Sequence, residues 1–492
     1  MNFSILSVII FLPMFVAFAL LVLPVGAKGT RNVAFVTSII IFILAMIVYL
    51  SFEFTGQMQF VEHHEWISSY GIYYSVGIDG FSLIILMLIA TLIPSAILLL
   101  WTGRTKGYWV NMLLIQSGIT GTLFSQDLIL FYFFWEAMLL PVFMIIGMFG
   151  TGNRVFSTIK VTVYTIMGSL FMFISILYIG VTFFHEFGVW SFALKDVVEI
   201  TTFTRNEEIW LFLGFMIAFA IKIPLFPFHT WLIQTYTNSP TGGVFLLSSI
   251  MAKLGVYGIV RFVMPLFPEL YKEFAPYLVW LGIFGLIYFG IAALMQTDIK
   301  KMFAYSSASH LGFIVTGVFS LNAYGMTGAL FLIIAHAMAT GGLFLLVGRM
   351  EYNLKTKNIS DLGGIAKQAP IFTVFFMIML LCIVGLPGTN GFVSEFLIIL
   401  GVFGMQPTAG IVSALTVLVA ASFMFWMFQR AILQDTENDS SNMIDLDKKE
   451  IIGLAPIAFL IIAMGVYPDW FLFKIEPTIQ HYLVDILQIK VN

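Results

Sequence analysis

Long apolar runs separated by short polar segments recur along almost the whole of this 492-residue chain. Hydrophobic residues make up 60% of it and charged residues only 10%, against about 45–50% and about 25% in soluble domains. So few charges cannot cover a surface that faces water. The sequence therefore predicts an integral membrane protein whose main solvent is lipid.

The lengths of the apolar runs fit membrane-spanning helices. A spanning helix needs about 20 apolar residues, because each residue rises about 1.5 Å and the hydrocarbon core is about 30 Å thick. By this measure we expect an all-α fold of about fourteen transmembrane helices and a short amphipathic tail, 474–490, at the interface. The predicted spans are 3–24, 33–52, 78–101, 108–125, 127–149, 158–184, 209–235, 241–267, 273–297, 300–321, 323–348, 371–404, 408–430 and 451–472.

Lysine and arginine are distributed unevenly between the two sets of loops. With the N-terminus placed outside, fifteen basic residues fall in cytoplasmic loops and five on the opposite side, tail included. Cytoplasmic loops of membrane proteins carry an excess of these residues. We therefore expect both termini on the periplasmic side of a bacterial inner (plasma) membrane.

Two predicted spans are interrupted by proline and glycine. The seventh, 209–235, contains IKIPLFPFHTW, and the twelfth, 371–404, contains GLPGTNGFVSEF. Because the two breaks lie five spans apart, their helices run in opposite directions, which predicts two inverted five-helix repeats, helices 4–8 and 9–13. Two ordinary proline kinks are the alternative. The predicted units are 1–101, 108–267 (first repeat), 273–430 (second repeat) and 451–492.

Several titratable side chains lie deep inside the predicted spans. A charge near the bilayer centre costs about 2.5–3.5 kcal/mol on insertion scales, so such residues are candidates for function. Carboxyl, amine and imidazole groups can each take up and release a proton. The candidates for proton translocation are Glu136, Lys222, Lys253, His310, His336 and Glu395.

Structural roles are the alternative for several of these residues. Glu136 and Lys222 can form a pair that switches its protonation, or one that only holds two helices together. Either His310 or His336 alone can be a helix-contact histidine. His229, just after the break in the seventh span, is shallower and a weaker candidate.

Other polar residues are assigned structural roles. Arg261, near the outer end of its span, is predicted to anchor that helix at the interface, and Asp79 and Asp127 are predicted to cap helices. Cys382 is the only cysteine, so the chain can form neither an intrachain disulfide nor a four-cysteine cluster site. We find no HExxH-type zinc spacing and no nucleotide-binding loop, and expect no metal or cofactor in this chain.

The segments that carry these residues resemble the antiporter-like subunits of respiratory complex I (NADH:quinone oxidoreductase), which are related to subunits of Mrp-type antiporters. They read DLILFYFFWEAMLLP, IKIPLFPFHTW, LMQTDIKKMFAYSSASHLGFI, IAHAM and GLPGTNGFVSEF. Within the family, an acid at Glu395, where sister subunits usually carry lysine, is similar to the branch called chain M or chain 4. The resemblance covers nearly all of the predicted spans.

The resemblance implies a role for each candidate. Glu136 and Lys222 match the family's Glu–Lys pair, and Lys253 matches its central lysine. His310 and His336 match the histidines that link two half-channels, and Glu395 matches the terminal acid.

The resemblance also implies the partners. These are the lipid bilayer and other membrane-arm subunits, including sister antiporter-like subunits, with no nucleic acid. NADH, FMN, iron–sulfur clusters and quinone are expected in partner subunits, and none of them in this chain. One segment departs from the family: Trp231 to Tyr236 read WLIQTY, where relatives commonly read WLPDAH. Gln234 and Tyr236 replace the usual Asp and His; if those two residues help proton entry from the cytoplasm in the family, entry here must use other groups or water.

We therefore predict a proton-translocating membrane-arm subunit of NADH:quinone oxidoreductase, a translocase whose redox chemistry takes place in other subunits. An Mrp-type Na⁺/H⁺ antiporter subunit and a membrane subunit of an energy-converting hydrogenase are the alternatives. A sodium site would need several oxygen ligands at one depth, and the carboxylates are scattered. A scaffold without transport is a third alternative.

Overall fold

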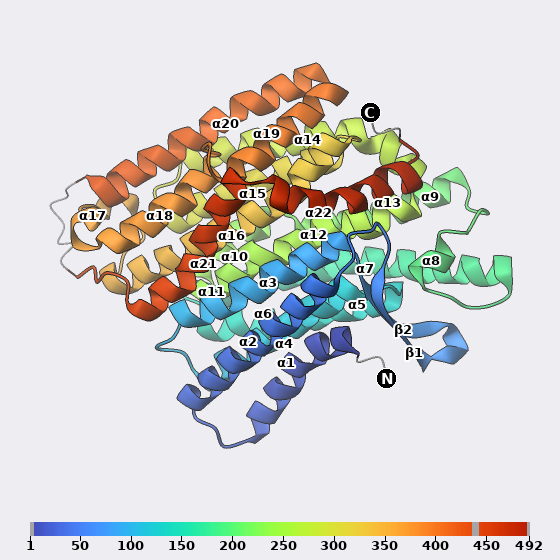
Figure 1. Cartoon of the computed structure of the whole chain (residues 1–492), viewed down its shortest axis with the longest axis horizontal. Helices are drawn as coiled ribbons and strands as arrows, with labels where there is room; N and C mark the ends of the chain where they lie inside the picture. The colour runs from blue at the N-terminus through green and yellow to red at the C-terminus, as the bar shows by residue number, and fades with distance from the viewer. Residues whose placement is uncertain (1–3, 435–441, 490–492) are drawn as a thin grey trace.

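The fold is a bundle of helices that run roughly along one direction (Figure 1), in a computed structural model that describes residues 4–434 and 442–489. Among these residues, ten helical runs are long and apolar enough to cross a membrane. The membrane class and the all-α fold predicted from the sequence are confirmed. The ten runs are α1 (Ile5–Val22), α2 (Ala27–Ser51), α3 (Gly80–Leu99), α5 with α6 (Leu128–Phe149), α7 (Arg154–Phe187), α11 to α13 (Thr241–Leu266), α14 (Pro268–Leu294), α16 (Ala323–Leu354), α20 with η5 (Pro407–Leu433) and α21 (Lys448–Val466).

The other four predicted spans are also helical, although they are not among those ten. Their positions agree with a total of fourteen, which itself stays a prediction. They are α4 (Lys106–Phe124), α9 with α10 (Arg205–Lys222 and Thr230–Asn238), α15 (Ile299–Val318) and α18 with α19 (Pro370–Ile383 and Asn390–Met405). Short helices between the spans are η1 (Ser68–Tyr70), α8 (Leu194–Val197), η4 (Ile359–Asp361) and α17 (Ile365–Gln368).

Both predicted helix breaks are confirmed. The seventh span ends at Lys222 and resumes at Thr230, and the twelfth ends at Ile383 and resumes at Asn390. Proline has no N–H to donate and clashes with the preceding turn, which explains an interruption at each site. The breaks leave carbonyl groups inside the bundle that no helix satisfies.

Two further irregularities were not predicted. The fifth span is divided at Met138 into α5 (Leu128–Ala137) and α6 (Leu139–Phe149). Pro141 lies in the first turn of α6 and cannot donate to the carbonyl of Ala137, which favours a break there. The eighth span contains two π-helical segments, η2 (Leu247–Met251) and η3 (Ile259–Val263), on either side of α12 (Ala252–Gly258). Such segments are frequent at functional sites.

A β-hairpin joins α2 to α3 and was also not predicted. Strands β1 (Gln59–Ile67) and β2 (Ile72–Ile78) pair antiparallel. The turn contains Gly71 at φ +61°, where an added Cβ would lie 2.0 Å from the carbonyl oxygen of Trp190, so only glycine fits. Glu62 on β1 accepts from the backbone N–H of Leu6 at 2.9 Å and so holds the start of α1.

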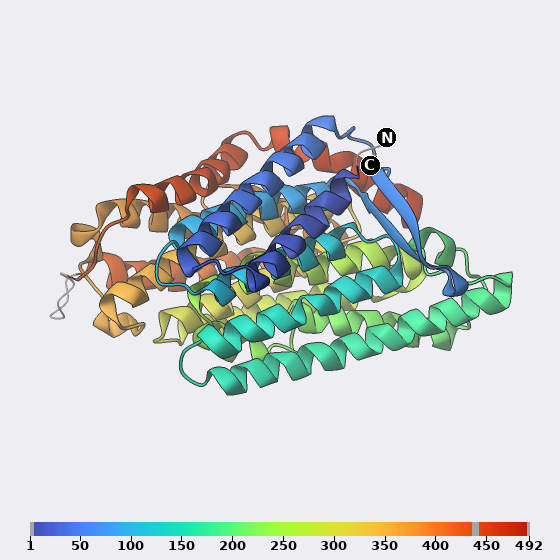
Figure 2. The same ribbon diagram turned by 90° about the horizontal axis from the view of Figure 1, so that it is seen from below.

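The C-terminal segment packs on the bundle rather than standing apart from it. It begins at Asp469, earlier than predicted, as α22 (Asp469–Gln480) and continues as η6 (His481–Ile486), with Ile475 and Ile479 buried. Residue 490 of the predicted tail lies outside the described residues. Figures 1 and 2 place η6 and the start of α1 at the end of the bundle that carries the hairpin. Both ends therefore lie on one side, as predicted; which membrane face this is stays a prediction.

Arg261 differs from its prediction as an interface anchor. Its side chain is buried in η3, and one of its terminal nitrogens lies 3.8 Å from Oδ2 of Asp79 and 3.4 Å from the hydroxyl of Tyr482. Tyr482 in turn donates to Asp79 at 3.1 Å. Asp79 also caps α3 through the N–H of Ser82, so its predicted capping role is confirmed. Because η6 covers the arginine, a charge that looked shallow in the sequence is an internal ion pair.

Asp127 caps α5, as predicted. Its carboxylate accepts from the N–H groups of Ile129 and Leu130. It has no cationic side chain within 4 Å among the described residues, which makes it a suitable reference for the cap that is paired with Arg261.

We expect Asp79→Asn to lower the free energy of unfolding by about 3–5 kcal/mol, because it leaves the buried Arg261 without its counter-charge. Asparagine caps a helix as well as aspartate does, so the loss reports the ion pair rather than the cap. Asp127→Asn is the matched control and should cost less than about 1 kcal/mol. Unfolding of the full chain in mixed micelles measures both. Equal losses would contradict a stabilising pair.

Candidate functional site

The predicted site residues lie on six different membrane helices. Lys222, Lys253, His310, His336 and Glu395 are 7%, 0%, 2%, 1% and 6% exposed, and Glu136 is half-buried. Within residues 4–434 and 442–489, no group of three or more His, Cys, Asp or Glu side chains is arranged to hold a metal ion. The six site residues are carried by α5 (Glu136), α9 (Lys222), α12 (Lys253), α15 (His310), α16 (His336) and α19 (Glu395).

Glu136 and Lys222 do not form an ion pair in this structure. Their charges interact electrostatically, but the part of the chain that is described contains no N···O contact between them within 4 Å. Glu136 faces the hydroxyl of Ser169 of α7, which donates to the carbonyl of Ile166 at 3.1 Å. The Lys222 ammonium lies 4.8 Å from the ring centroid of Trp135, in a cation–π contact. Lys222 is also the last residue of α9, where the helix dipole favours a cation.

Lys253 lies fully buried between the two π-helical segments. Its ammonium donates to the backbone carbonyl of Ser248, in η2. The hydrogen-bond partner of this buried ammonium therefore lies in the π segment, five residues earlier in the chain. Gly255, one turn further, packs so closely on α9 that an added Cβ would lie 2.6 Å from Ile223 and 3.0 Å from the carbonyl of Phe219. This close approach sets α12 against the end of α9 that carries Lys222.

His336 stacks on His310 and lies within electrostatic range of Lys253. Its ring stacks on that of His310, with centroids 5.5 Å apart and planes at 14°. It also interacts electrostatically with Lys253. Neither of its ring nitrogens has a hydrogen-bond partner among the residues that the structure describes. Both nitrogens are therefore free to exchange a proton with a neighbouring carrier.

We call the six site residues the row, and His310 and Glu395 form its closest pair. The Nδ1 atom of His310 lies 2.8 Å from the carbonyl of Ser306, and Nε2 lies 3.0 Å from the carbonyl of Ile383 and 3.5 Å from Glu395 Oε1. Only the imidazolium form donates from both nitrogens, so this geometry favours a protonated ring beside a carboxylate. Gly385, at φ +69°, makes room: an added Cβ would lie 2.4 Å from Glu395 Oε2.

Serine hydroxyls beside the row were missed in the sequence. Ser249, Ser306 and Ser307 are buried, and within the described part of the chain their side-chain oxygens have no hydrogen-bond partner. Each belongs to a serine pair a few residues before a candidate, in SSIMAK and SSASH. That proximity was the available signal. Unpaired hydroxyls in an apolar bundle are suited to holding water between proton carriers.

A polar cavity of about 720 Å³ opens near the break in the seventh span, on the side of the predicted basic loops; we call it the vestibule. His229 lines it, is 7% exposed and has an unpartnered Nδ1. Gln234, from the WLIQTY segment, also lines it and accepts from Lys160 at 3.3 Å. Tyr236 instead is fully buried and packs edge-on against Phe344. Ile233 and Gln234 both line the vestibule, so the departure from the family motif changes its wall at these two positions and not at Tyr236.

Comparison with known proteins agrees with this arrangement. The sequence model of the family described as "NADH:quinone oxidoreductase/Mrp antiporter, TM" matches residues 125–424, which include all six site residues. NADH-quinone oxidoreductase subunit M of Rickettsia bellii (strain RML369-C) is 37% identical over 496 residues, covering 98% of this chain and 99% of the relative.

Two solved structures share the fold. A chain of respiratory complex I from Thermus thermophilus with bound NADH superposes with a TM-score of 0.88 at 30% identity, covering 98% of this chain and 99% of that one. A chain of the Mrp complex from Dietzia sp. DQ12-45-1b gives 0.86 at 17% identity, covering 99% and 98%; at that identity the likeness shows the fold alone. The chain thus belongs to the NADH:quinone oxidoreductase/Mrp antiporter family of membrane proteins.

Proposed function

We propose that the chain translocates protons as a membrane-arm subunit of an NADH:quinone oxidoreductase. The observation that carries the proposal is the contact series His336, His310 and Glu395, buried in the bundle beside Lys253. Such groups are costly to bury and exchange protons readily. The names of the relatives and the Thermus complex support this assignment over the other branches of the family.

In this proposal protons enter the row through the vestibule and leave it at Glu395. His229, at the vestibule wall, passes protons toward Lys222 by way of water at the helix break. Lys222 hands them to Lys253, whose helix packs against the end of α9 at Gly255. The two stacked histidines and Glu395 complete the route.

Glu136 is proposed to control whether Lys222 keeps its proton. A carboxylate beside a buried ammonium stabilises the charged form. In this structure the two are separated and the ammonium lies against Trp135, which represents the state in which Lys222 releases its proton. If Glu136 moved closer to Lys222, the lysine would take up a proton again.

The proposal places the energy source outside this chain. Moving one charge against 100 mV takes about 2.3 kcal/mol, which electron transfer from NADH to quinone in partner subunits supplies, with FMN and iron–sulfur clusters bound there. We place both termini on the periplasmic side of a bacterial inner membrane. The route then joins two inverted repeats, 108–267 and 273–430, which are flanked by 1–101 and 451–492.

Neutralising either member of the Glu136–Lys222 couple tests the proposal. In sealed membrane vesicles, Lys222→Ala and, separately, Glu136→Gln are expected to lower NADH-driven proton uptake by about tenfold or more, because each removes a group that carries or controls the proton. Lys272→Ala and Glu269→Gln are matched controls, since these residues form a surface ion pair at 2.6 Å. Assembly of the complex and NADH oxidation are measured alongside.

Three outcomes would contradict the proposal. Unchanged uptake in both variants of an assembled complex would leave the charges structural and favour the scaffold. Uptake that requires sodium would favour an antiporter. If NADH drives no proton uptake in unmutated membranes, the result would favour the hydrogenase branch.

The His310–Glu395 pair provides a second test. Glu395→Gln keeps the shape of the side chain but removes the charge that faces the imidazolium, so uptake per NADH oxidised should fall by about tenfold or more. Glu351→Gln is the control, because Glu351 pairs with Lys300 away from the row. A Glu395→Gln complex that pumps like the unmutated one would exclude Glu395 from the route.

His229, at the wall of the vestibule, provides a test of proton entry by this route. His229→Leu removes the unpartnered imidazole and should slow proton uptake several-fold while the complex stays assembled, with the loss growing as bulk proton concentration falls. Tyr236→Phe is the control, because its hydroxyl is buried away from the vestibule. Stopped-flow measurement with a pH-sensitive dye follows both. Equal rates in the two variants would rule out uptake past His229.

A further inference from the structure

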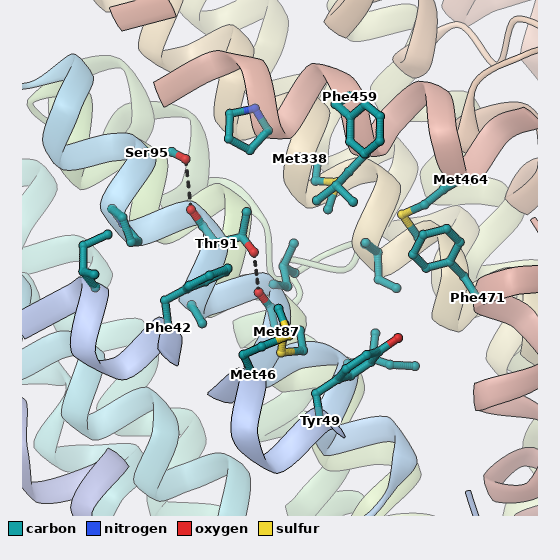
Figure 3. A pocket seen from close by; sticks show the side chains of 18 of the residues that line it. Phe42, Met46, Tyr49, Met87, Thr91, Ser95, Met338, Phe459, Met464 and Phe471 are labelled. Atoms are coloured by element: carbon teal, nitrogen blue, oxygen red, sulfur yellow. Dashed lines mark hydrogen bonds between the residues drawn. The ribbon is translucent and has the colours of Figure 1, made fainter. Parts of the chain in front are cut away.

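An apolar groove runs between α2, α3, α16, α21 and α22 (Figure 3). Its volume is about 560 Å³. The labelled side chains that line it include four methionines, which adapt to irregular ligands. The hydroxyls of Thr91 and Ser95 point along it but donate to the carbonyls of Met87 and Thr91. The groove wall therefore offers no free polar group and suits a hydrocarbon.

Two cations meet at one end of this groove. The Arg31 guanidinium lies 4.0 Å, and the Lys449 ammonium 4.7 Å, from the ring centroid of Trp101. Among the described residues, neither cation has a carboxylate within ion-pair distance. Arg31 donates instead to the carbonyl of Trp101, at 2.9 Å, and to Asn32.

The cations and the groove belong to one continuous surface. Near this end, a groove residue of α2, α3 or α21 lies within about one turn, along the chain, of each member of the cluster formed by Arg31, Trp101 and Lys449. Phe35 of α2, which lines the groove, packs edge-on against Trp101 with centroids 5.6 Å apart. The pairs are Phe35 with Arg31, Leu98 with Trp101, and Ile452 with Lys449.

The dimensions of the groove decide what fits. It is lined on α2 from Phe35 to Tyr49, a rise of about 21 Å at about 1.5 Å per residue. A volume of about 560 Å³ over that length, between apolar walls, is enough for an extended hydrocarbon chain.

We propose that the groove holds one acyl chain of an anionic phospholipid whose phosphate binds Arg31 and Lys449. The groove is longer than half of the hydrocarbon core, which is about 15 Å, so an acyl chain from one leaflet fits within it. Basic pockets between helices on the cytoplasmic side bind anionic headgroups, and this end carries the predicted cytoplasmic loops. At the other end, Lys474 is already engaged with the hydroxyl and ring of Tyr49, so the headgroup lies at the Arg31 end.

Native mass spectrometry of the full chain in its complex tests this site. The sample is taken from vesicles of phosphatidylcholine with one tenth phosphatidylglycerol. The unmutated chain is expected to retain phosphatidylglycerol in preference to phosphatidylcholine. Arg31→Gln with Lys449→Gln should weaken that retention about 10- to 30-fold, since each charge near the surface contributes to binding.

Matched variants separate this site from general charge effects. Lys355→Gln with Arg430→Gln removes two other cations that lie over aromatic rings, those of Tyr352 and Trp426, and should change nothing. Thr91→Phe fills the groove and should expel the lipid while both headgroup cations remain.

Two results would overturn the proposal. The first is equal retention of both lipids by the unmutated chain. The second is full retention of phosphatidylglycerol in the Arg31 and Lys449 double variant. A density map of the complex with a polypeptide segment in the groove would assign it to a partner protein instead.

Discussion

The centre of this bundle depends on one constraint: a charge or imidazole surrounded by lipid and apolar helices must find polar partners inside the protein. The chain meets it by interrupting helices. The break after Ile383 exposes a carbonyl to His310, and the π segment before Lys253 supplies the carbonyl of Ser248. Carbonyls in the middle of a regular helix are already bonded. The break in the twelfth span is therefore what gives His310 a carbonyl partner outside its own helix.

Much of the row could be predicted from the sequence because its signals are local. Lys253 and Glu395 stand out, since a charge deep in an apolar run is costly to insert and is therefore rare unless it has a function. The breaks were also predictable, because proline acts through its own backbone. The distance between Glu136 and Lys222 was not, because it depends on how two helices pack. The structure places Trp135 beside the ammonium where the sequence suggested a carboxylate.

The features that sequence reasoning missed depend on distant packing or on geometry without a residue signature. The π segments around Lys253 contain no proline, and no residue type marks them. The break at Met138 follows from Pro141, which the apolar run concealed. Arg261 looked shallow by its distance from the end of its span, but Tyr482, far along the chain, covers it. Burial of that kind becomes visible only when the whole fold is known.

The two halves of the row are in different states, and this asymmetry bears on how a proton would move. His310 and Glu395 are in contact, whereas Glu136 and Lys222 are apart. If both pairs were in contact, each would keep its proton. If both pairs were apart, no carboxylate would be near enough to stabilise a newly protonated group. Transport under the proposed function therefore requires the two pairs to alternate. In that proposal Lys253 passes the proton from one pair to the other; its ammonium donates to the carbonyl of Ser248, and its helix lies between the two π segments.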